Sequence, residues 1–169
     1  MKLFNTMEFN SLDDLYVEQL QDLYDAELRI INALPKMADA ASSVDLKRAF
    51  EEHLRQTEEH ASRLETIFRQ MGKEPQRETC EAMQGLIAEG EEMISARGNP
   101  DVRDAALVAA AQRVEHYEIA GYGTARTFAD RLGHREASSL LQQTLEEEKQ
   151  TDQRLTRIAE ENVNLRAAD

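Results

Sequence analysis

The sequence contains few cysteine, proline, glycine and aromatic residues, and each of these shortages excludes some classes of fold or site. Its 169 residues include one cysteine, Cys80, which excludes an internal disulfide and an iron–sulfur or rubredoxin-type centre built from several thiolates. There are three prolines, seven glycines and no tryptophan, and aromatic residues make up 5% of the chain. Because alanine, leucine, glutamate, glutamine and arginine are abundant instead, the composition favours helices over sheets. We therefore predict an all-α fold.

The chain also lacks an excess of positive charge and a long apolar run. Its formal net charge is −13 at pH 7, and no basic cluster is present that could bind the phosphates of a nucleic acid. No segment approaches the ~20 apolar residues that span a bilayer, and the N-terminal stretch "MKLFNTMEFNSLDD" has no apolar core of signal-peptide length. We expect a cytoplasmic protein that binds neither nucleic acid nor membranes. Its length suits a single domain over residues 1–169.

Apolar residues that recur every three to four positions predict four long helices and one shorter helix. The expected ranges are 11–41, 44–71, 79–96, 102–131 and 135–162. Asn10 or Ser11 can cap the first helix, and Gly72 can end the second. Pro35 lies inside the first helix and is expected to kink or break it. These segments predict a four-helix bundle of two helical hairpins, with the short helix in the crossover between the hairpins.

Polar residues interrupt the apolar faces of the second and fourth long helices. In the second helix the inward positions read Leu46, Phe50, His53, Thr57, His60, Leu64, Ile67 and Met71. In the fourth they read Ala137, Leu141, Thr144, Glu148, Thr151, Leu155 and Ile158. A face that served packing alone would carry leucine or isoleucine throughout. The two halves of the chain also match weakly at a constant offset, which places Glu27 on Glu118 and His60 on Thr151.

Hairpin geometry brings several of these polar residues to one level. Counted from the turn near Ser43, Glu27 faces the segment 57–60; counted from the turn near Gly133, the pair Glu115 and Glu118 faces the segment 148–152. We therefore predict a convergent set in the core: Glu27, His60, Glu115, Glu118 and Glu148. Four buried carboxylates would repel one another and lose their hydration, and a pair of divalent cations would remove that penalty.

The chemistry of this set favours two divalent metal ions and does not choose between iron and manganese; we expect iron ahead of manganese. Carboxylate oxygens and an imidazole nitrogen suit both metals, and a carboxylate can bridge two ions. Such sites commonly take a glutamate from each of two helices and Glu-x-x-His from each of the other two. Here the second helix has Thr57-x-x-His60 and the fourth has Glu148-x-x-Thr151. The site is expected to be lopsided, with Glu115 supplying a missing ligand.

Other polar residues could border the site. His53 lies about two turns from the level of the carboxylates, ~9 Å along the axis, so we expect it to support a ligand, although it could instead supply the nitrogen ligand. Asp152 and Tyr24 each lie one turn from a predicted ligand and are candidates for hydrogen bonds to it. His116 and His134 are expected at the surface or in a turn.

Six segments of the chain carry a family resemblance: "DLYDAE", "ALPKMA", "AFEEHLRQTEEH", "AMQGLI", "DAALVAAAQRVEHYEIAGYG" and "LLQQTLEEEKQTD". They resemble the YciE/YciF family of ferritin-like bacterial stress proteins, and the similarity runs from about Leu12 to Asn164. The resemblance implies a ferritin-like bundle, a homodimer and a rubrerythrin-like metal site with a ferroxidase role. By position it carries over Glu27 from "YDAE", Glu115 and Glu118 from "EHYE", and Glu148 from "EEEK".

These features predict a stress protein with a di-metal site that acts as a ferroxidase or a peroxide-consuming oxidoreductase, with O₂ or peroxide as its substrate. Because the chain has no further thiolates, its reductant would come from outside. The alternative is a metal-free helical stress protein or dimerisation module, in which the carboxyl groups are protonated or are hydrogen-bonded by Thr57, Thr151 and tyrosines. A third hypothesis, a relative of manganese catalase, predicts oxygen evolution from peroxide.

Overall fold

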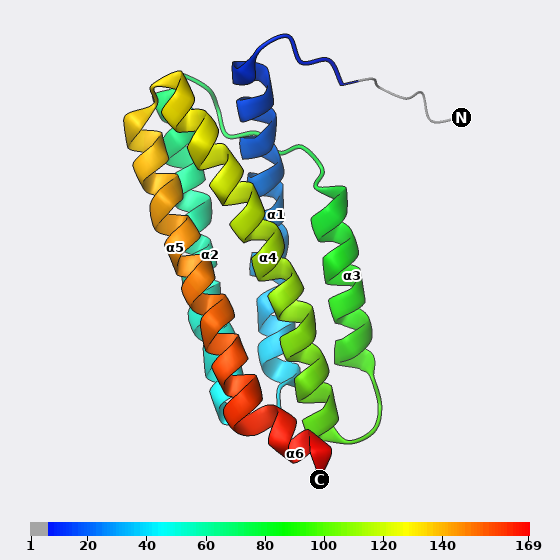
Figure 1. Ribbon diagram of the computed structural model, residues 1–169. Coiled ribbons are helices and arrows are strands. Elements are labelled where there is room, and N and C mark those ends of the chain that lie inside the picture. Colours follow the sequence, from blue (N-terminus) through cyan, green and yellow to red (C-terminus); the bar gives the residue numbers. More distant parts are fainter. Residues whose placement is uncertain (1–6) are drawn as a thin grey trace, which may run out of the picture.

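The chain forms a helical bundle in the computed structural model, which describes residues 7–169 (Figure 1). Residues 1–6, which begin both the expected domain and the N-terminal stretch considered above, lie outside the described residues. The elements are α1 (Leu12–Ala40), α2 (Val44–Gln70), α3 (Glu81–Ser95), α4 (Pro100–Leu132), α5 (Arg135–Ile158), η1 (Ala159–Val163) and α6 (Asn164–Ala168). Every element within residues 7–169 is a helix, which confirms the predicted all-α class. Among these helices, none combines the length and the apolar character that crossing a membrane would require.

The helix ends agree with the predicted ranges except at the C-terminus. The first four of the five predicted helices begin and end within two residues of the expected positions. The last predicted range, 135–162, is α-helical only as far as Ile158. Residues Ala159–Val163 form a π-helical turn, which widens the coil before α6 resumes the α-helical pattern.

Pro35 does not break α1, which excludes one of the two effects expected from the sequence, a kink or a break. The helix continues as one element to Ala40, and Pro35 lies exposed on its outer side near the C-terminal end. A proline removes one backbone hydrogen bond. The neighbouring side chains Leu34 and Met37 are buried in the core, so their packing holds the last turns of α1 in place.

Local capping chemistry sets where the hairpins turn. The hydroxyl of Ser43 accepts a hydrogen bond from the backbone N–H of Leu46 at 3.4 Å and begins α2. At the other hairpin, Gly133 adopts a left-handed backbone with φ 80°, which ends α4 at low steric cost. The side chain of Asn99 caps the start of α4, where Pro100 occupies the first helical position.

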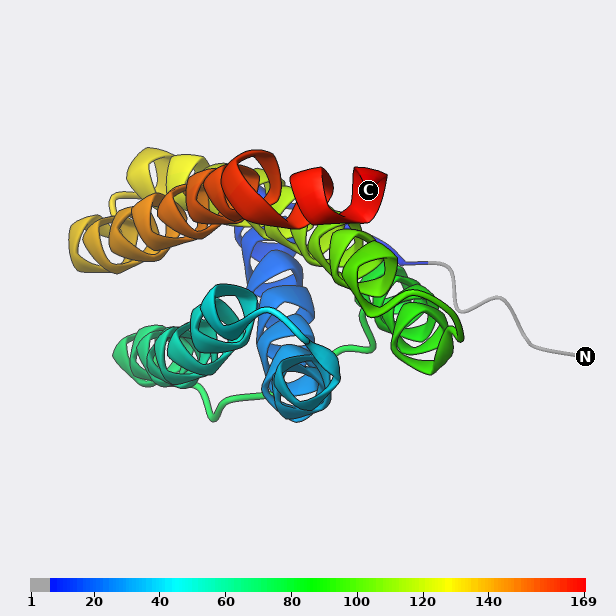
Figure 2. The same cartoon turned by 90° about the horizontal axis from the view of Figure 1, so that it is seen from below.

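The two hairpins pack face to face, as the view along the bundle shows (Figure 2). Helices α1 and α2 form one pair and α4 and α5 the other, with further contacts of α1 on α4 and of α2 on α5. Helix α3 lies against α1 and α4 and covers the junction between the two hairpins. This is the predicted ferritin-like bundle with a short helix in its crossover.

Two apolar clusters fill the bundle on either side of a polar middle layer. One contains Ile30, Leu34, Phe50, Leu107 and Leu155. The other, towards the opposite end, contains Leu20, Leu64, Phe68, Tyr122 and Leu141. The residues between them along each helix include the acidic and imidazole side chains described below. The middle layer is therefore bordered at both ends by apolar side chains.

Buried hydrogen bonds fasten the start of α3 to α1. The carboxylate of Asp25, which is 2% exposed, accepts the backbone N–H of Cys80 at 2.9 Å and pairs with Arg77 at 2.7 Å and with Arg29 at 2.5 Å. The thiol of Cys80 in turn donates to the hydroxyl of Tyr117 on α4 at 3.1 Å. These contacts set the position of α3 over the junction of α1 and α4.

Candidate metal centre

Six ionisable side chains from four helices meet in the middle layer. Each is at most 3% exposed. They are Glu27 on α1, His53 and His60 on α2, Glu115 and Glu118 on α4, and Glu148 on α5. The structure thus brings together all five residues predicted as ligands and adds His53 to them.

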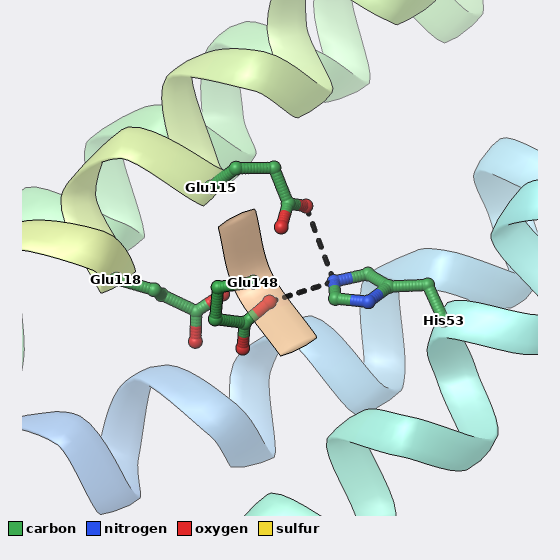
Figure 3. A group of neighbouring side chains, drawn as sticks. All are labelled: His53, Glu115, Glu118 and Glu148. Carbon is green, nitrogen blue, oxygen red and sulfur yellow. Dashed lines mark ion pairs between the residues drawn. The ribbon is translucent and has the colours of Figure 1, made fainter. Parts of the chain in front are cut away.

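The six side chains form two groups that share one carboxylate. In each group every residue offers one possible ligand atom, and these atoms lie within 4.8 Å of one another. The first group is His53, Glu115, Glu118 and Glu148, drawn in Figure 3; the second is Glu27, His60 and Glu148. Because Glu148 belongs to both groups, its two oxygens can serve two adjacent cations.

In the first group, His53 points its Nε2 atom at the carboxylates (Figure 3). This nitrogen lies 3.1 Å from Oε1 of Glu115 and 3.9 Å from Oε2 of Glu148. On the other edge of the ring, Nδ1 lies 3.4 Å from the hydroxyl of Thr151. His53 therefore reaches the carboxylates with its side chain, although the sequence placed it about two turns from their level. The rings of His53 and His60 incline towards each other, with centroids 6.5 Å apart, although seven residues of helix separate their backbones by ~10 Å.

In the second group, a hydrogen bond fixes the orientation of His60. Its Nε2 atom lies 2.8 Å from Oε2 of Glu147, while its Nδ1 atom lies 2.9 Å from Oε1 of Glu148 and 3.5 Å from Oε1 of Glu27. Arg63 holds Glu147 with two hydrogen bonds of 2.6 Å and 3.0 Å. If a cation replaced the proton on Nδ1 while Glu147 kept the proton on Nε2, the ring would have the arrangement that is common around histidine ligands.

Tyr122 and Glu147 are site residues that the prediction from the sequence missed. Tyr122 is 1% exposed and donates a hydrogen bond to Oε1 of Glu27. It follows Glu118 by four residues on the buried face of α4, so helical spacing alone could have indicated it. No comparable signal identifies Glu147, because a residue beside an inward-facing Glu148 is expected to face solvent.

Two other predicted neighbours lie outside both groups. The hydroxyl of Tyr24 donates to Glu65 at 3.0 Å, away from Glu27. Asp152 is half-buried, accepts a hydrogen bond from Gln112 at 3.0 Å and lies 3.3 Å from the exposed His116. Both side chains are half-buried, because each residue directly follows an inward-facing one, Leu23 or Thr151. His134 lies in the turn before α5, as expected.

Most of the unsatisfied buried polar atoms within residues 7–169 belong to this centre. Eleven side-chain nitrogen and oxygen atoms are buried without an assigned hydrogen bond among the described residues, and eight of them come from the six side chains. Two of the eight are the histidine nitrogens, whose approaches to carboxylate oxygens become ion pairs only when the rings are protonated. Both carboxylate oxygens of Glu118 and both of Glu148 are among the eight. An unsatisfied buried polar group costs ~1–3 kcal/mol, more when charged. The donor set therefore fits a bound cation, which would satisfy these atoms together.

When no cation is present, burial and mutual repulsion raise the pKa values of the four carboxyl groups. Burial raises the pKa of Glu118 well above its ordinary range, and the carboxylates of Glu27 and Glu148 raise that pKa further. Burial also raises the pKa of Glu115, to about 8. The pKa values of Glu27 and Glu148 are raised for the same reason, in part offset by His60. Without added positive charge, the cluster would hold protons at neutral pH.

The pKa values of His60 and Glu147 shift in the directions that favour their charged forms. Burial alone would lower the pKa of His60, but Glu27, Glu147 and Glu148 outweigh it and raise the pKa to about 12. Burial opposes ionisation of Glu147, yet hydrogen bonds from His60 and Arg63 lower its pKa to about 2. Glu147 thus stays ionised and holds the Nε2 proton of His60 across the neutral range.

Comparisons with known proteins agree with this architecture. The profile of a family described as "Domain of unknown function (DUF892)" matches residues 11–168. The chain is 45% identical over 162 residues to protein YciF of Escherichia coli (strain K12). The aligned region covers 95% of this chain and 98% of YciF. The crystal structure of the E. coli stress protein YciF superposes with a TM-score of 0.89, covering 92% of this chain and 99% of that one. YcfI of Rhodopseudomonas palustris, provisionally described as a structural protein, superposes with a TM-score of 0.86 at 39% identity, covering 90% and 98%.

Proposed function

The chain belongs to the DUF892 family, as a YciF-type protein, and from that premise we propose that it is a stress protein which binds two divalent metal ions. The proposed activity is oxidation of Fe(II) or consumption of peroxide. A cytoplasmic homodimer remains part of the proposal, and fractionation and gel filtration would test it.

The observation that carries this proposal is the convergence of unsatisfied buried ligand atoms. Eight of them, from four glutamates and two histidines, face one another in a layer bordered at both ends by apolar clusters. A structural bundle gains nothing from such a layer, since leucine at these positions would pack without the desolvation penalty. Two cations would compensate the four carboxylates, and the mixture of oxygen and imidazole ligands suits iron or manganese.

The chain's own residues have distinct roles in this proposal. His53, Glu115 and Glu118 would hold one ion, Glu27 and His60 the other, and Glu148 both. Glu147 keeps the proton on Nε2 of His60, so that Nδ1 stays available. The hydroxyl of Tyr122 holds Glu27 in place. When bound, the two ions would supply one-electron redox chemistry towards O₂ or peroxide.

Metal analysis of protein purified without chelator tests the proposal. Two iron or manganese ions per chain are expected in the wild type and none in Glu118→Ala/Glu148→Ala. The matched control is Glu58→Ala/Glu146→Ala, which removes the same charge from exposed positions of α2 and α5. The metal-loaded wild type should oxidise Fe(II) or consume peroxide, and the ligand variant should not. Oxygen evolution from peroxide without a reductant would indicate catalase chemistry instead.

Two observations favour the metal-free alternative. The raised pKa values allow protonated carboxyl groups to fill the layer, and the similar YcfI has a provisional description as a structural protein. This alternative predicts a wild-type protein without metal and with an unchanged melting temperature when Fe(II) is added anaerobically. The same measurements therefore separate the two functions.

A further inference from the structure

An apolar pocket lies beneath α3, where this helix covers the junction of α1 and α4. It leaves about 30 Å³ for the centre of a water-sized molecule. Its walls come from the helices α1 to α5 and are mostly hydrocarbon: Ile30, Phe50, Leu86, Ile87, Val114 and Leu155. A water molecule needs two to four polar partners, and the hydrocarbon side chains of the middle of the pocket offer none, so this middle part is expected to be dry.

The inner end of the pocket reaches the first metal-ligand group. His53, Glu115 and Thr151 line it there. His53 is 3% exposed and Glu115 is 1% exposed, and Oε2 of Glu115 has no hydrogen-bond partner among the described residues. The residues of the second group that are not shared, Glu27 and His60, do not line the pocket. The space therefore leads to one side of the centre.

The outer end of the pocket lies between α1 and α3. Lys36 and Glu91 form an ion pair of 2.7 Å there, and their side chains are 58% and 51% exposed. Both residues line the pocket, as does Gly90 on the inner side of α3. A surface ion pair of this kind contributes ~0–1 kcal/mol, so it can open without a large cost.

Gly90 is the clearest sign that the space is a real vacancy in the packing. It is buried, yet a Cβ atom built at this position would meet no atom within 4 Å. By contrast, a Cβ atom at Gly121 would lie 2.8 Å from Leu23 Cδ2, so close packing explains that glycine. A glycine inside a helix costs ~0.5–1 kcal/mol relative to alanine. At Gly90 no close contact explains the choice of glycine. The absence of a side chain at this position keeps the pocket open.

We propose that this pocket binds dioxygen and conducts it to the His53–Glu115 side of the centre. The proposal rests on the function proposed above and selects one of its two oxidants. Dioxygen is small and apolar, so it enters a dry hydrocarbon space without losing hydrogen bonds. Hydrogen peroxide would lose its hydrogen bonds to water there and find few replacements, which disfavours it.

Xenon, an apolar probe that can be located by its anomalous scattering, tests the binding site in metal-free protein. Crystals under xenon pressure should show a peak between α3 and the α1–α4 junction in the wild type. Gly90→Leu should remove the peak, because its side chain fills the pocket. Gly85→Leu is the matched control, since Gly85 is an exposed glycine of the same helix with no atom within 4 Å of a built Cβ, and it should keep the peak. If Gly90→Leu fails to fold, Gly90→Ala should still reduce the xenon occupancy.

Kinetics of the metal-loaded protein test the delivery of dioxygen. Gly90→Leu should slow Fe(II) oxidation by O₂ while leaving the metal content and the rate with peroxide unchanged. A wild-type pocket without xenon, or an O₂-dependent rate that is equal in Gly90→Leu and Gly85→Leu, would overturn the proposal. If xenon binds but the chain takes up no metal, the apolar site stands. The proposed function and the delivery of dioxygen to a metal centre are then both overturned.

Discussion

Glu147 accepts the Nε2 proton of His60 across 2.8 Å, and this contact determines which nitrogen of the ring faces the buried carboxylates. Glu147 is adjacent in sequence to Glu148, whose Oε1 lies 2.9 Å from Nδ1 of the same ring. One turn of α5 therefore contacts both edges of a single imidazole. The outer carboxylate orients the ring, and the inner one is a candidate ligand.

Glu147→Gln is expected to weaken metal binding without unfolding the protein. The amide accepts a weaker hydrogen bond and also loses the charge that pairs with Arg63, so the orientation of His60 is less well fixed. Loss of such an outer partner typically costs ~10–100-fold in metal affinity. Competition titration against a chromophoric chelator measures the change. Glu146→Gln, one residue earlier and exposed, should leave the affinity at the wild-type value.

The two ligand groups predict different metal counts for single variants. His53→Ala and His60→Ala should each bind one ion per chain, and Glu148→Ala should bind neither ion tightly, because both groups include it. Elemental analysis after gel filtration gives these counts. His116→Ala, at an exposed position outside both groups, should keep two ions. A His53→Ala protein that also keeps two would assign His53 a supporting role only.

The metal-free protein should lose stability as the pH rises from about 5 to about 9. The pKa of Glu115 is raised from its ordinary value of 4.5 to about 8, so its stabilising contribution is complete below 4.5 and is lost as the pH rises through 8. His60, whose pKa is raised from 6.5 to about 12, acts in the same direction above pH 6.5. Melting temperatures in chelator should therefore fall across this range. The fall should be smaller in Glu115→Gln and unchanged in the exposed control Glu58→Gln. A flat wild-type profile would contradict the buried charge distribution.

Two glycine variants should change the stability of the bundle in opposite directions. Gly121→Ala would place a methyl group 2.8 Å from Leu23 Cδ2, at the contact of α4 with α1. Overpacking of this kind destabilises by ~1–3 kcal/mol. Gly85→Ala adds its methyl group in open space, because Gly85 is an exposed residue of α3. This variant should stabilise the protein by ~0.5–1 kcal/mol. Chemical denaturation of both variants provides the comparison.

The fold follows closely from local patterns in the sequence. Apolar periodicity, the cap at Ser43 and the left-handed Gly133 together specify two hairpins whose lengths match. Once the hairpins are set, counting residues from each turn brings Glu27, Glu115, Glu118 and Glu148 to one layer. Each of these steps depends on regular helix geometry, which varies little between proteins.

The details of the centre depend on side-chain reach, which residue counting ignores. His53 was expected about two turns away, but its inclined ring spans that separation and contacts Glu115. Tyr24 and Tyr122 have similar spacings to a predicted ligand, yet only Tyr122 has the rotational position that points inward. The pocket beneath α3 depends on how a separate helix settles on the bundle, so no local pattern predicts it.

The shared carboxylate of Glu148 has a consequence for how the centre would fill. An ion held by one oxygen would orient the whole carboxylate and fix its second oxygen towards the other position. The first binding event would then prepare the second, and a titration of the empty protein would be sigmoidal, with few singly loaded molecules at half saturation. Through this one side chain, the two positions would load with positive cooperativity.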